Sequence, residues 1–320
     1  MRFIAEHKDR ADGGLRWGVE SICAVLCEHG SAIAPSTYYE AALRPPSKRA
    51  VRDEALKVEI ARVRGANYDV YGPRKIWLQL NREGIPVARC TVERLMKDLQ
   101  LQGVRRGRRV ITTRSDGRAA RPADLVQRRF RPAAPNRLWV ADFTYVSTWS
   151  GTVYVAFVID AYAGAIVGWE ASASKHTRFM ESAIRQAAAL RSRQGHPIED
   201  AIHHSDAGSQ YTSVRFGETL SLSGLRPSVG SVGDAYDNAL AETTIGLYKN
   251  ECIRADSPFR RGPLNTLSDV EYITADYVAW YNQQRLMHRL GRVPPAEAEA
   301  QYYSQHVTDR PAGSQNPEGA

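Results

Sequence analysis

Hydrophobic residues in the first hundred positions recur at helical spacing. An amphipathic pattern covers residues 17–29 and ends at Gly30, and a further helix is expected from about residue 52 to residue 64. Two more helices are predicted at 73–82, which opens with a proline, and at 88–100. The last of these helices gathers its apolar residues on one face, at Val92, Leu95, Met96 and Leu99.

Residues 83–86 predict a turn between these last two helices, and the second helix is basic. A helix, a short turn containing glycine and a basic helix form the helix-turn-helix pattern, whose second helix enters DNA. A plain helical hairpin with solvent-facing charges is the alternative. The cations of this helix that are candidate DNA contacts are Arg89, Arg94 and Lys97.

From residue 136 the pattern changes to β-strands. Three runs rich in β-branched and aromatic residues have short connections that contain glycine, so antiparallel strands are expected at 138–146, 152–160 and 165–172. A helix, a strand, a helix, a strand and a helix follow, which is an α/β order. These elements are expected at about 178–194, 200–204, 213–223, 225–229 and 237–254, and a last helix at about 268–282.

The net charge of +8 is divided unevenly, with +12 on residues 1–135 and −4 on residues 136–320. A basic front half suits a polyanion such as DNA, and an acidic rear half suits DNA only if some carboxylates hold divalent cations. Residues 104–131 hold ten arginines and two acids. This segment predicts a flexible basic linker that tracks phosphates, or else a solubilising, disordered tether. Its candidate DNA contacts are Arg105, Arg106, Arg108 and Arg109.

The composition, with 43% hydrophobic and 24% charged residues, is that of a globular protein. No apolar run reaches the roughly 18 residues of a membrane span, and the first residues lack the apolar stretch of a signal peptide. We therefore expect no membrane partner and a cytoplasmic, nucleoid-associated location. Cys23 and Cys27 are four residues apart; we expect them to line one buried helix face, with a zinc site as the alternative.

Three acids are candidates for phosphodiester chemistry. Asp142 lies in the middle of an apolar strand, where a charge is costly unless it is paired or metal-bound. Asp206 follows the strand at 200–204, at the carboxyl end, where open α/β sheets build sites. Glu242 lies early in the long helix, and Lys249, seven residues on, shares its face. Catalysis with two divalent ions needs such carboxylates to converge from separate elements.

Each of these acids has a simpler explanation when it is taken alone. Asp142 would be an edge-strand charge, Asp206 an Asx-turn residue and Glu242 a solvated helix acid. Other acids that we expect to lie outside the site are Asp160 and Glu170, at the rims of the sheet, and Glu251, on a different helix face.

Several ordered segments decide between these explanations. The segments WVADFTYV, HHSDAGSQYTS and SVGDAYDNALAETTIGLYKNE contain the three acids, and 35 residues separate Asp206 from Glu242. Together with VIDAYAGAIVGW, they resemble the integrase-like core of bacterial insertion-sequence transposases, in the branch whose second overlapping frame encodes the catalytic protein. Residues 71–104 are similar to the family's helix-turn-helix-like module, and YNQQRLMHRLGRVPPAEA (281–298) is similar to its C-terminal signature.

The resemblance implies an α/β fold, with a ribonuclease-H-like integrase core of a mixed five-stranded sheet and flanking helices, preceded by a small all-α helix-turn-helix-like module. It implies that Asp142, Asp206 and Glu242 are catalytic and hold two Mg²⁺ or Mn²⁺ ions. Cleavage at the ends of an insertion element would leave a 3′-OH, which attacks another phosphodiester without a covalent protein–DNA intermediate. The implied partners are double-stranded DNA (element ends and target), further copies of the chain, and an upstream-frame protein joined as a fusion.

The expected division of the chain follows from the same segments. It comprises an N-terminal helical segment (1–50), the helix-turn-helix-like module (51–104), the basic linker (105–133), the catalytic core with its C-terminal helix (134–300) and a disordered tail (301–320). Two other functions stay open at this stage. One is a catalytically inactive, transposase-derived DNA-binding regulator, and the other is a nuclease that cuts without joining.

Overall fold

A computed structural model of the chain divides into two compact units, Met1–Glu59 and Ile60–Ala320. The residues that the structure describes are 1–105, 125–126, 130–196, 198, 200–205, 214–229 and 239–307. Within them, no helix is long and apolar enough to cross a membrane. The predicted site residues that lie outside the described ranges are Asp206, Arg106, Arg108 and Arg109.

The first unit consists of short helices and a two-stranded ribbon. Its elements are α1 (Arg2–His7), β1 (Ala11–Asp12), β2 (Leu15–Arg16), α2 (Val19–Glu28), α3 (Pro35–Leu43) and the first part of α4 (Lys48–Ala66). Helix α1 and the ribbon were not predicted, because such short segments show no hydrophobic period. Cys23 lies in the core and Cys27 is exposed, so only the first of them lines a buried face. The described residues contain no cluster of three possible metal ligands.

Helices α5 (Pro73–Arg82) and α6 (Arg89–Asp98) form the predicted hairpin of the helix-turn-helix-like module. The apolar face predicted for α6 is buried, at Val92, Leu95 and Met96. The indole of Trp77 donates to the carbonyl of Val87 at 2.9 Å, which fixes the turn between the two helices. Helix α4 begins at Lys48 rather than near residue 52, because its exposed and charged first turn carries no apolar signal.

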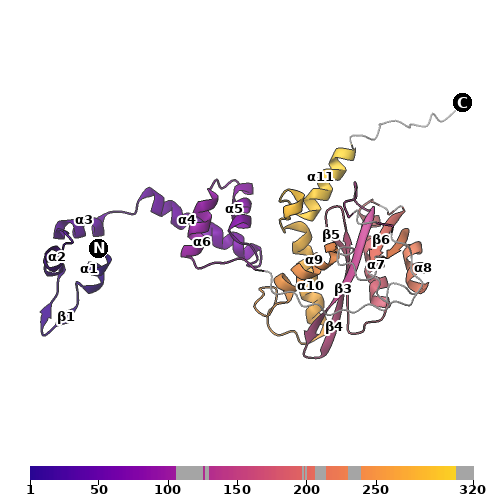
Figure 1. The fold of residues 1–320 in the computed structure, drawn as a ribbon, viewed down its shortest axis with the longest axis horizontal. Coiled ribbons are helices and arrows are strands. Elements are labelled where there is room, and N and C mark those ends of the chain that lie inside the picture. The colour runs from indigo at the N-terminus through magenta and orange to yellow at the C-terminus, as the bar shows by residue number, and fades with distance from the viewer. Residues whose placement is uncertain are drawn as a thin grey trace. The chain divides into compact units, whose positions relative to one another are not determined.

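Five strands form one mixed sheet in the order β5-β4-β3-β6-β7. Strands β3, β4, β5 and β6 of this sheet are labelled in Figure 1. Their bounds are β3 (Leu138–Thr148), β4 (Gly151–Asp160), β5 (Ala165–Ser172), β6 (Ala201–Ser205) and β7 (Leu225–Val229). Strands β3, β4 and β5 form an antiparallel meander, and β6 and β7 run parallel to β3. This order is the ribonuclease-H-like topology, so the predicted fold class is confirmed.

Helices cover both faces of the sheet. Helices α7 (Arg178–Arg193) and α8 (Val214–Leu222) pack on the face that carries Trp139, Ala141, Ala156 and Val158. A Cβ at Gly168 would collide with the carbonyl oxygen of Ala183, so glycine at this position lets α7 lie close to β5. Helices α9 (Ala239–Tyr248) and α10 (Leu267–Gln283) pack on the opposite face, against β3, β4 and β5.

The helix-turn-helix-like module is fastened to the catalytic core through aromatic side chains. The hydroxyl of Tyr68 donates to Asp276 of α10 at 2.8 Å, and its ring stacks on Phe259 with centroids 3.7 Å apart. The hydroxyl of Tyr71 donates to the carbonyl of Gln284 at 2.9 Å. These contacts place the start of α5 beside the end of α10.

A helix that the sequence analysis did not predict, α11 (Pro295–Val307), packs against the core. It extends into the segment predicted as a disordered tail, so that prediction was wrong up to Val307. Its Glu299 accepts two hydrogen bonds of 2.7 Å from Arg191 of α7, and Arg191 also donates to Asp160 at 3.1 Å. Asp160 is fully buried rather than at an exposed rim, and burial, reinforced by the charge of Glu299, raises its pKa to about 6.

The trio of Asp160, Arg191 and Glu299 generates a stability prediction. Replacing the cation in Arg191→Met leaves two buried acids without their partner, and we expect the free energy of unfolding to fall by about 3–5 kcal/mol. Urea denaturation of the full chain measures this loss. The control Arg193→Met, at an exposed position of the same helix, should change it by less than about 0.5 kcal/mol. Equal losses in the two variants would contradict a structural role for the trio.

Candidate active site

Asp142 lies on the central strand β3, where its side chain is half-buried. It pairs in register with Phe157 of β4, so the two side chains point to the same face of the sheet. The ring of Phe157 contacts Tyr248 of α9, with centroids 5.0 Å apart. Asp142 therefore faces the layer that contains α9. One of its carboxylate oxygens accepts a 2.7 Å hydrogen bond from the amide of Phe143.

Strand β6 leads the chain to Asp206. It pairs in parallel with residues 138–141 of β3, and the last pair joins Ala141 to Ser205. Each of these two residues is followed in the sequence by one of the predicted acids, Asp142 or Asp206. Asp206 itself lies outside the described residues, so its place in the site stays a prediction that the register favours.

Glu242 lies in the first turn of α9, and its side chain is half-buried. The side chains that α9 buries against the sheet are Ala241, Thr244, Ile245 and Tyr248. Because Glu242 directly follows Ala241 and α9 packs on β3, the structure brings the helix of Glu242 onto the strand of Asp142.

Lys249 reaches the same strand. Its ammonium lies 4.7 Å from the ring centroid of Tyr145, three residues beyond Asp142. Burial lowers the pKa of Lys249, and the negative charge of Asp142 opposes this shift. A cation therefore lies close to the candidate metal-binding acid, where it is suited to a phosphate oxygen. The aromatic ring of Tyr145 that supports it was not singled out from the sequence.

The long helix predicted to reach residue 254 instead changes to a π-helix, η1 (Lys249–Ile253). The side-chain amide of Asn250 donates to the carbonyl of Gly246 at 2.6 Å, and the amide of Arg254 bonds back to Lys249. A side chain that enters the helical ladder in this way widens the turn. The widened turn buries Glu251, which therefore lies outside the site, as predicted.

The buried Glu251 binds Arg285, from the C-terminal signature, through two hydrogen bonds of 2.8 and 2.6 Å. Another residue of that signature, Asn282, exchanges two hydrogen bonds with the backbone of Ile166, at 2.9 and 2.8 Å. Its side-chain amide thus occupies the edge of β5 as an additional strand would. Both residues hold the core together, a role that their sequence pattern does not reveal.

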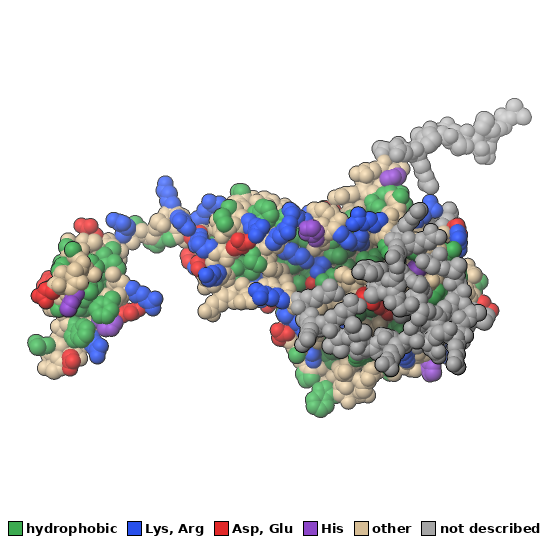
Figure 2. All heavy atoms as spheres, in the orientation of Figure 1, with side chains coloured by type: hydrophobic (Ala, Val, Ile, Leu, Met, Phe, Trp, Pro, Cys, Tyr) green, Lys and Arg blue, Asp and Glu red, His purple; other side chains and the backbone are tan. Residues whose placement is uncertain are grey.

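The described candidate DNA contacts of the module differ in how free their charges are. Arg89 pairs with Glu93 at 2.7 Å, and Arg94 approaches Asp98 at 3.6 Å. Among the described residues, no carboxylate lies within ion-pair distance of Lys97, which is exposed, as is Arg105. Lys and Arg side chains gather over the module on the face shown in Figure 2. Lys97 is thus the candidate whose charge is most available to a ligand.

The described part of the site suits a hard divalent cation. Mg²⁺ and Mn²⁺ take oxygen ligands, and the carboxylates of Asp142 and Glu242 come from separate elements that pack together. Both carboxylates are half-buried, so a cation can reach them from solvent.

Comparisons with known proteins agree with this architecture. Models described as "Integrase core domain" match residues 132–235 and 223–295, and a model described as "HTH-like domain" matches residues 51–109. A putative transposase for insertion sequence element IS986/IS6110 of Mycobacterium tuberculosis is 57% identical over 281 residues, which are 88% of this chain and 99% of the relative. The transposase for insertion sequence element IS629 of Shigella sonnei is 49% identical over 294 residues, which are 90% of this chain and 94% of the relative.

Solved structures similar to the chain include the HTLV-2 integrase catalytic core domain in complex with magnesium (trimeric form). It is 20% identical, with a TM-score of 0.40, and the match covers 53% of this chain and 99% of that chain. The assignment to a family rests on the sequence relatives.

The acids generate a prediction about metal binding. Mn²⁺ at about 100 times its dissociation constant should stabilise the native chain by about 2.7 kcal/mol, measured as a rise in melting temperature. Asp142→Asn or Glu242→Gln should remove most of this rise, because each deletes an anionic ligand. The control Glu170→Gln alters an acid that accepts a hydrogen bond from Ser182 and should leave the rise intact. An unchanged rise in both site variants would place the metal elsewhere.

Proposed function

This chain belongs to the insertion-sequence transposases with an integrase core, and we propose that it cuts DNA at the ends of its element and joins the resulting 3′-OH to target DNA. We further propose that Asp142, Asp206 and Glu242 form its metal-binding catalytic set. The product of the first step is the nucleophile of the second, so one site serves both transfers without a covalent protein–DNA intermediate.

The observation that carries this proposal is the pairing of β3 with β6. The last residue pair, Ala141 with Ser205, directly precedes Asp142 and Asp206 in the sequence. Parallel neighbours in register point to the same face, and Glu242 comes from a helix that packs on β3. The register of β3 with β6 and the packing of α9 on β3 support a joint role for the three acids beside the carboxyl end of β6.

Two Mg²⁺ or Mn²⁺ ions, when bound, would neutralise charge at the scissile phosphate and activate the attacking oxygen. The side chains of Asp142, Asp206 and Glu242 would hold them. The amide of Phe143 orients the carboxylate of Asp142, because it occupies one of its oxygens. Lys249, held over the ring of Tyr145, would bind a phosphate next to the reacting one.

The remaining cations serve DNA binding in this proposal. The module contributes Arg89, Arg94 and Lys97, and the linker contributes Arg105, Arg106, Arg108 and Arg109. The partners are double-stranded DNA at the element ends and the target, further copies of the chain in the DNA complex, and an upstream-frame protein as a fusion. The place of action is then the nucleoid in the cytoplasm.

Charge-removing variants of the three acids test the catalytic set. Asp142→Asn, Asp206→Asn and Glu242→Gln should each lower cleavage and strand transfer by at least about a thousandfold, because each removes a ligand that the transition state requires. DNA affinity should stay within about threefold, since phosphate contacts dominate it. Excision from a plasmid bearing the element ends, with and without Mg²⁺, measures cleavage. Pre-cut ends measure joining.

The outcomes of these assays separate the possible functions. Full activity in one variant would remove that residue from the site. A wild-type chain that binds the ends but neither cuts nor joins would be a regulator. Cleavage without strand transfer from pre-cut ends would make the chain a nuclease.

The cations of α6 give a second prediction. Lys97→Ala should weaken binding to a DNA duplex uniformly across sequences and lower the slope of log affinity against log salt by about 1. Arg89→Ala should lower the slope less, because Glu93 already pairs with that guanidinium. Fluorescence anisotropy over a salt series measures both slopes. Equal slopes in Lys97→Ala and the native chain would show that this face of α6 does not contact phosphate.

A further inference from the structure

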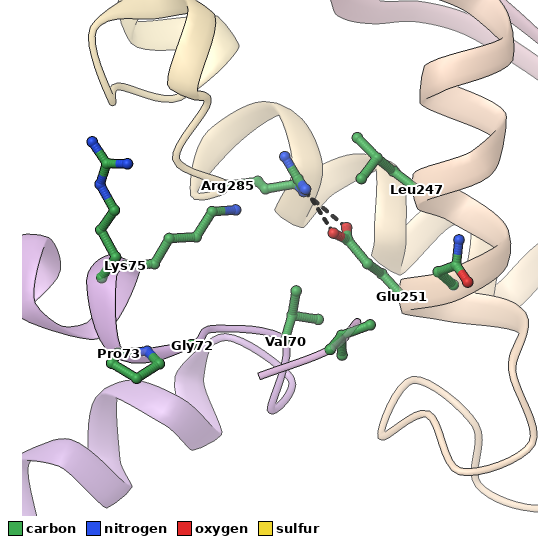
Figure 3. Close-up of a pocket in the computed structure, with 10 residues that line it drawn as sticks. Val70, Gly72, Pro73, Lys75, Leu247, Glu251 and Arg285 are labelled. Carbon is green, nitrogen blue, oxygen red and sulfur yellow. Dashed lines mark hydrogen bonds and ion pairs between the residues drawn. The ribbon is translucent and has the colours of Figure 1, made fainter. Parts of the chain in front are cut away.

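A pocket of about 370 Å³ lies between the helix-turn-helix-like module and the catalytic core. The start of α5 forms one side, and η1 together with the end of α10 forms the other (Figure 3). The lining residues that matter here are Gly72, Lys75, Val104, Asn250, Glu251 and Arg285. None of them belongs to the candidate catalytic set.

Three cations and one acid line this pocket, namely Arg74, Lys75, Arg285 and Glu251. Lys75 points across the pocket toward Arg285, whose guanidinium is directed away from it and binds both oxygens of Glu251 (Figure 3). Among the described residues, no carboxylate lies within ion-pair distance of Lys75. When Lys75 is protonated, the lining therefore has an excess of two positive charges, which favours an anion.

The ammonium of Lys75 is held in place by its surroundings. It lies 4.8 Å from the ring centroid of Tyr71, and the hydroxyl of Tyr71 bonds both to the carbonyl of Gln284 and to the amide of Leu286, at 2.9 Å each. A Cβ at Gly103 would lie 2.5 Å from the backbone nitrogen of Gly72, so glycine lets these two segments meet at the wall of the pocket. The position of the cation is thus set before any ligand binds.

We propose that this pocket is a phosphate subsite in which Lys75 holds a backbone phosphate of the DNA bound by the transposase. A phosphodiester carries a negative charge, which the positively charged lining of the pocket attracts. Arg285 keeps its pair with Glu251, and Lys75 supplies the direct hydrogen-bond donor to the phosphate. This inference rests on the proposed function, because it takes DNA as the source of the phosphate.

The position of the pocket relative to the active site supports DNA as that source. Asn250 and Glu251 line the pocket from the same π-helical turn whose first residue, Lys249, lies beside Asp142. A phosphate in the pocket and a phosphate at Lys249 would thus lie on two sides of one turn. The same DNA can then contact the module, the pocket and the catalytic acids.

The subsite predicts a dependence of DNA affinity on pH. Burial, followed by the charge of Arg285, lowers the pKa of Lys75 to about 7, with Glu251 opposing the shift. The other charged group in the lining is Arg74, and burial raises the pKa of Tyr71, whose ring contacts Lys75, to about 12. A bound phosphate favours charged Lys75, so the affinity should fall as Lys75 loses its proton, by about tenfold between about pH 6 and pH 8.

The experiment uses the full chain and a fluorescent DNA duplex of mixed sequence. Lys75→Met should bind more weakly than the native chain at about pH 6, with a salt slope lower by about 1 and little dependence on pH. Lys75→Arg keeps a permanent charge, so it should bind tightly at both pH values. Lys57→Met, at a lysine paired with Glu54 in α4, is the matched control and should behave as the native chain does. Thermal melts confirm that each variant is folded.

A second readout follows Lys75 directly in the native chain. The rate at which an acylating reagent modifies it, measured by mass spectrometry across a pH series, reports its pKa, and the duplex should slow that rate at least tenfold. Native affinity, salt slope and pH dependence in Lys75→Met would overturn the proposal. Protection by inorganic phosphate but not by the duplex would also overturn DNA as the source. Asp142→Asn should keep the full pH dependence of DNA affinity. An error in the catalytic assignment would therefore leave this result unchanged, whereas an error in the subsite would not.

Discussion

The hydrogen bonds between β3 and β6 determine how the catalytic unit is arranged. These strands are far apart in the sequence and run in parallel, which requires a crossover, and α7 lies in the connection. Their register ends at Ala141 and Ser205, one residue before the two candidate aspartates. The apolar face of β3 packs against α7, which leaves the face of Asp142 to α9. If β3 slipped by one residue in this register, its side chains would change faces, and Asp142 would point into the apolar core beneath α7.

Buried ion pairs connect the elements around that sheet. Arg191 joins the end of β4 to α11 through Asp160 and Glu299, and Arg285 joins the end of α10 to η1 through Glu251. Such pairs add little net stability compared with a well-packed apolar core, but removing one partner leaves a buried charge uncompensated. They therefore act mainly to exclude other arrangements of the helices. The C-terminal signature serves this purpose in the present chain, since Arg285 and Asn282 fasten it to the core.

The π-helical turn links the two functional regions of the unit. It presents Lys249 to Asp142 on one side and presents Asn250 and Glu251 to the pocket on the other. The module meets this turn through the start of α5, held by Tyr68 and Tyr71. In the proposed function, DNA that contacts the module would lie in a fixed position relative to β3, the strand of Asp142, because Tyr68 and Tyr71 hold the module to the core. In the proposed function, the charges for this task lie both on α6 and at the pocket between the module and the catalytic core.

The elements whose signals are local could be predicted from the order of residues alone. The alternation of β3 to β5, the proline that opens α5 and the apolar face of α6 depend on neighbouring residues and were correctly predicted. Asp142 was recognised because a charge in an apolar strand conflicts with its surroundings, and the resemblance to a family added Asp206 and Glu242. Which charges are buried, and which partners they have, depends on how distant segments pack together. Asp160 and Lys75 look like ordinary surface residues in the sequence. Arg285 acquires its role from Glu251, 34 positions away, and Glu299 from Arg191, 108 positions away. The π-helical turn and α11 also depended on such contacts, because neither has an apolar period strong enough to predict it.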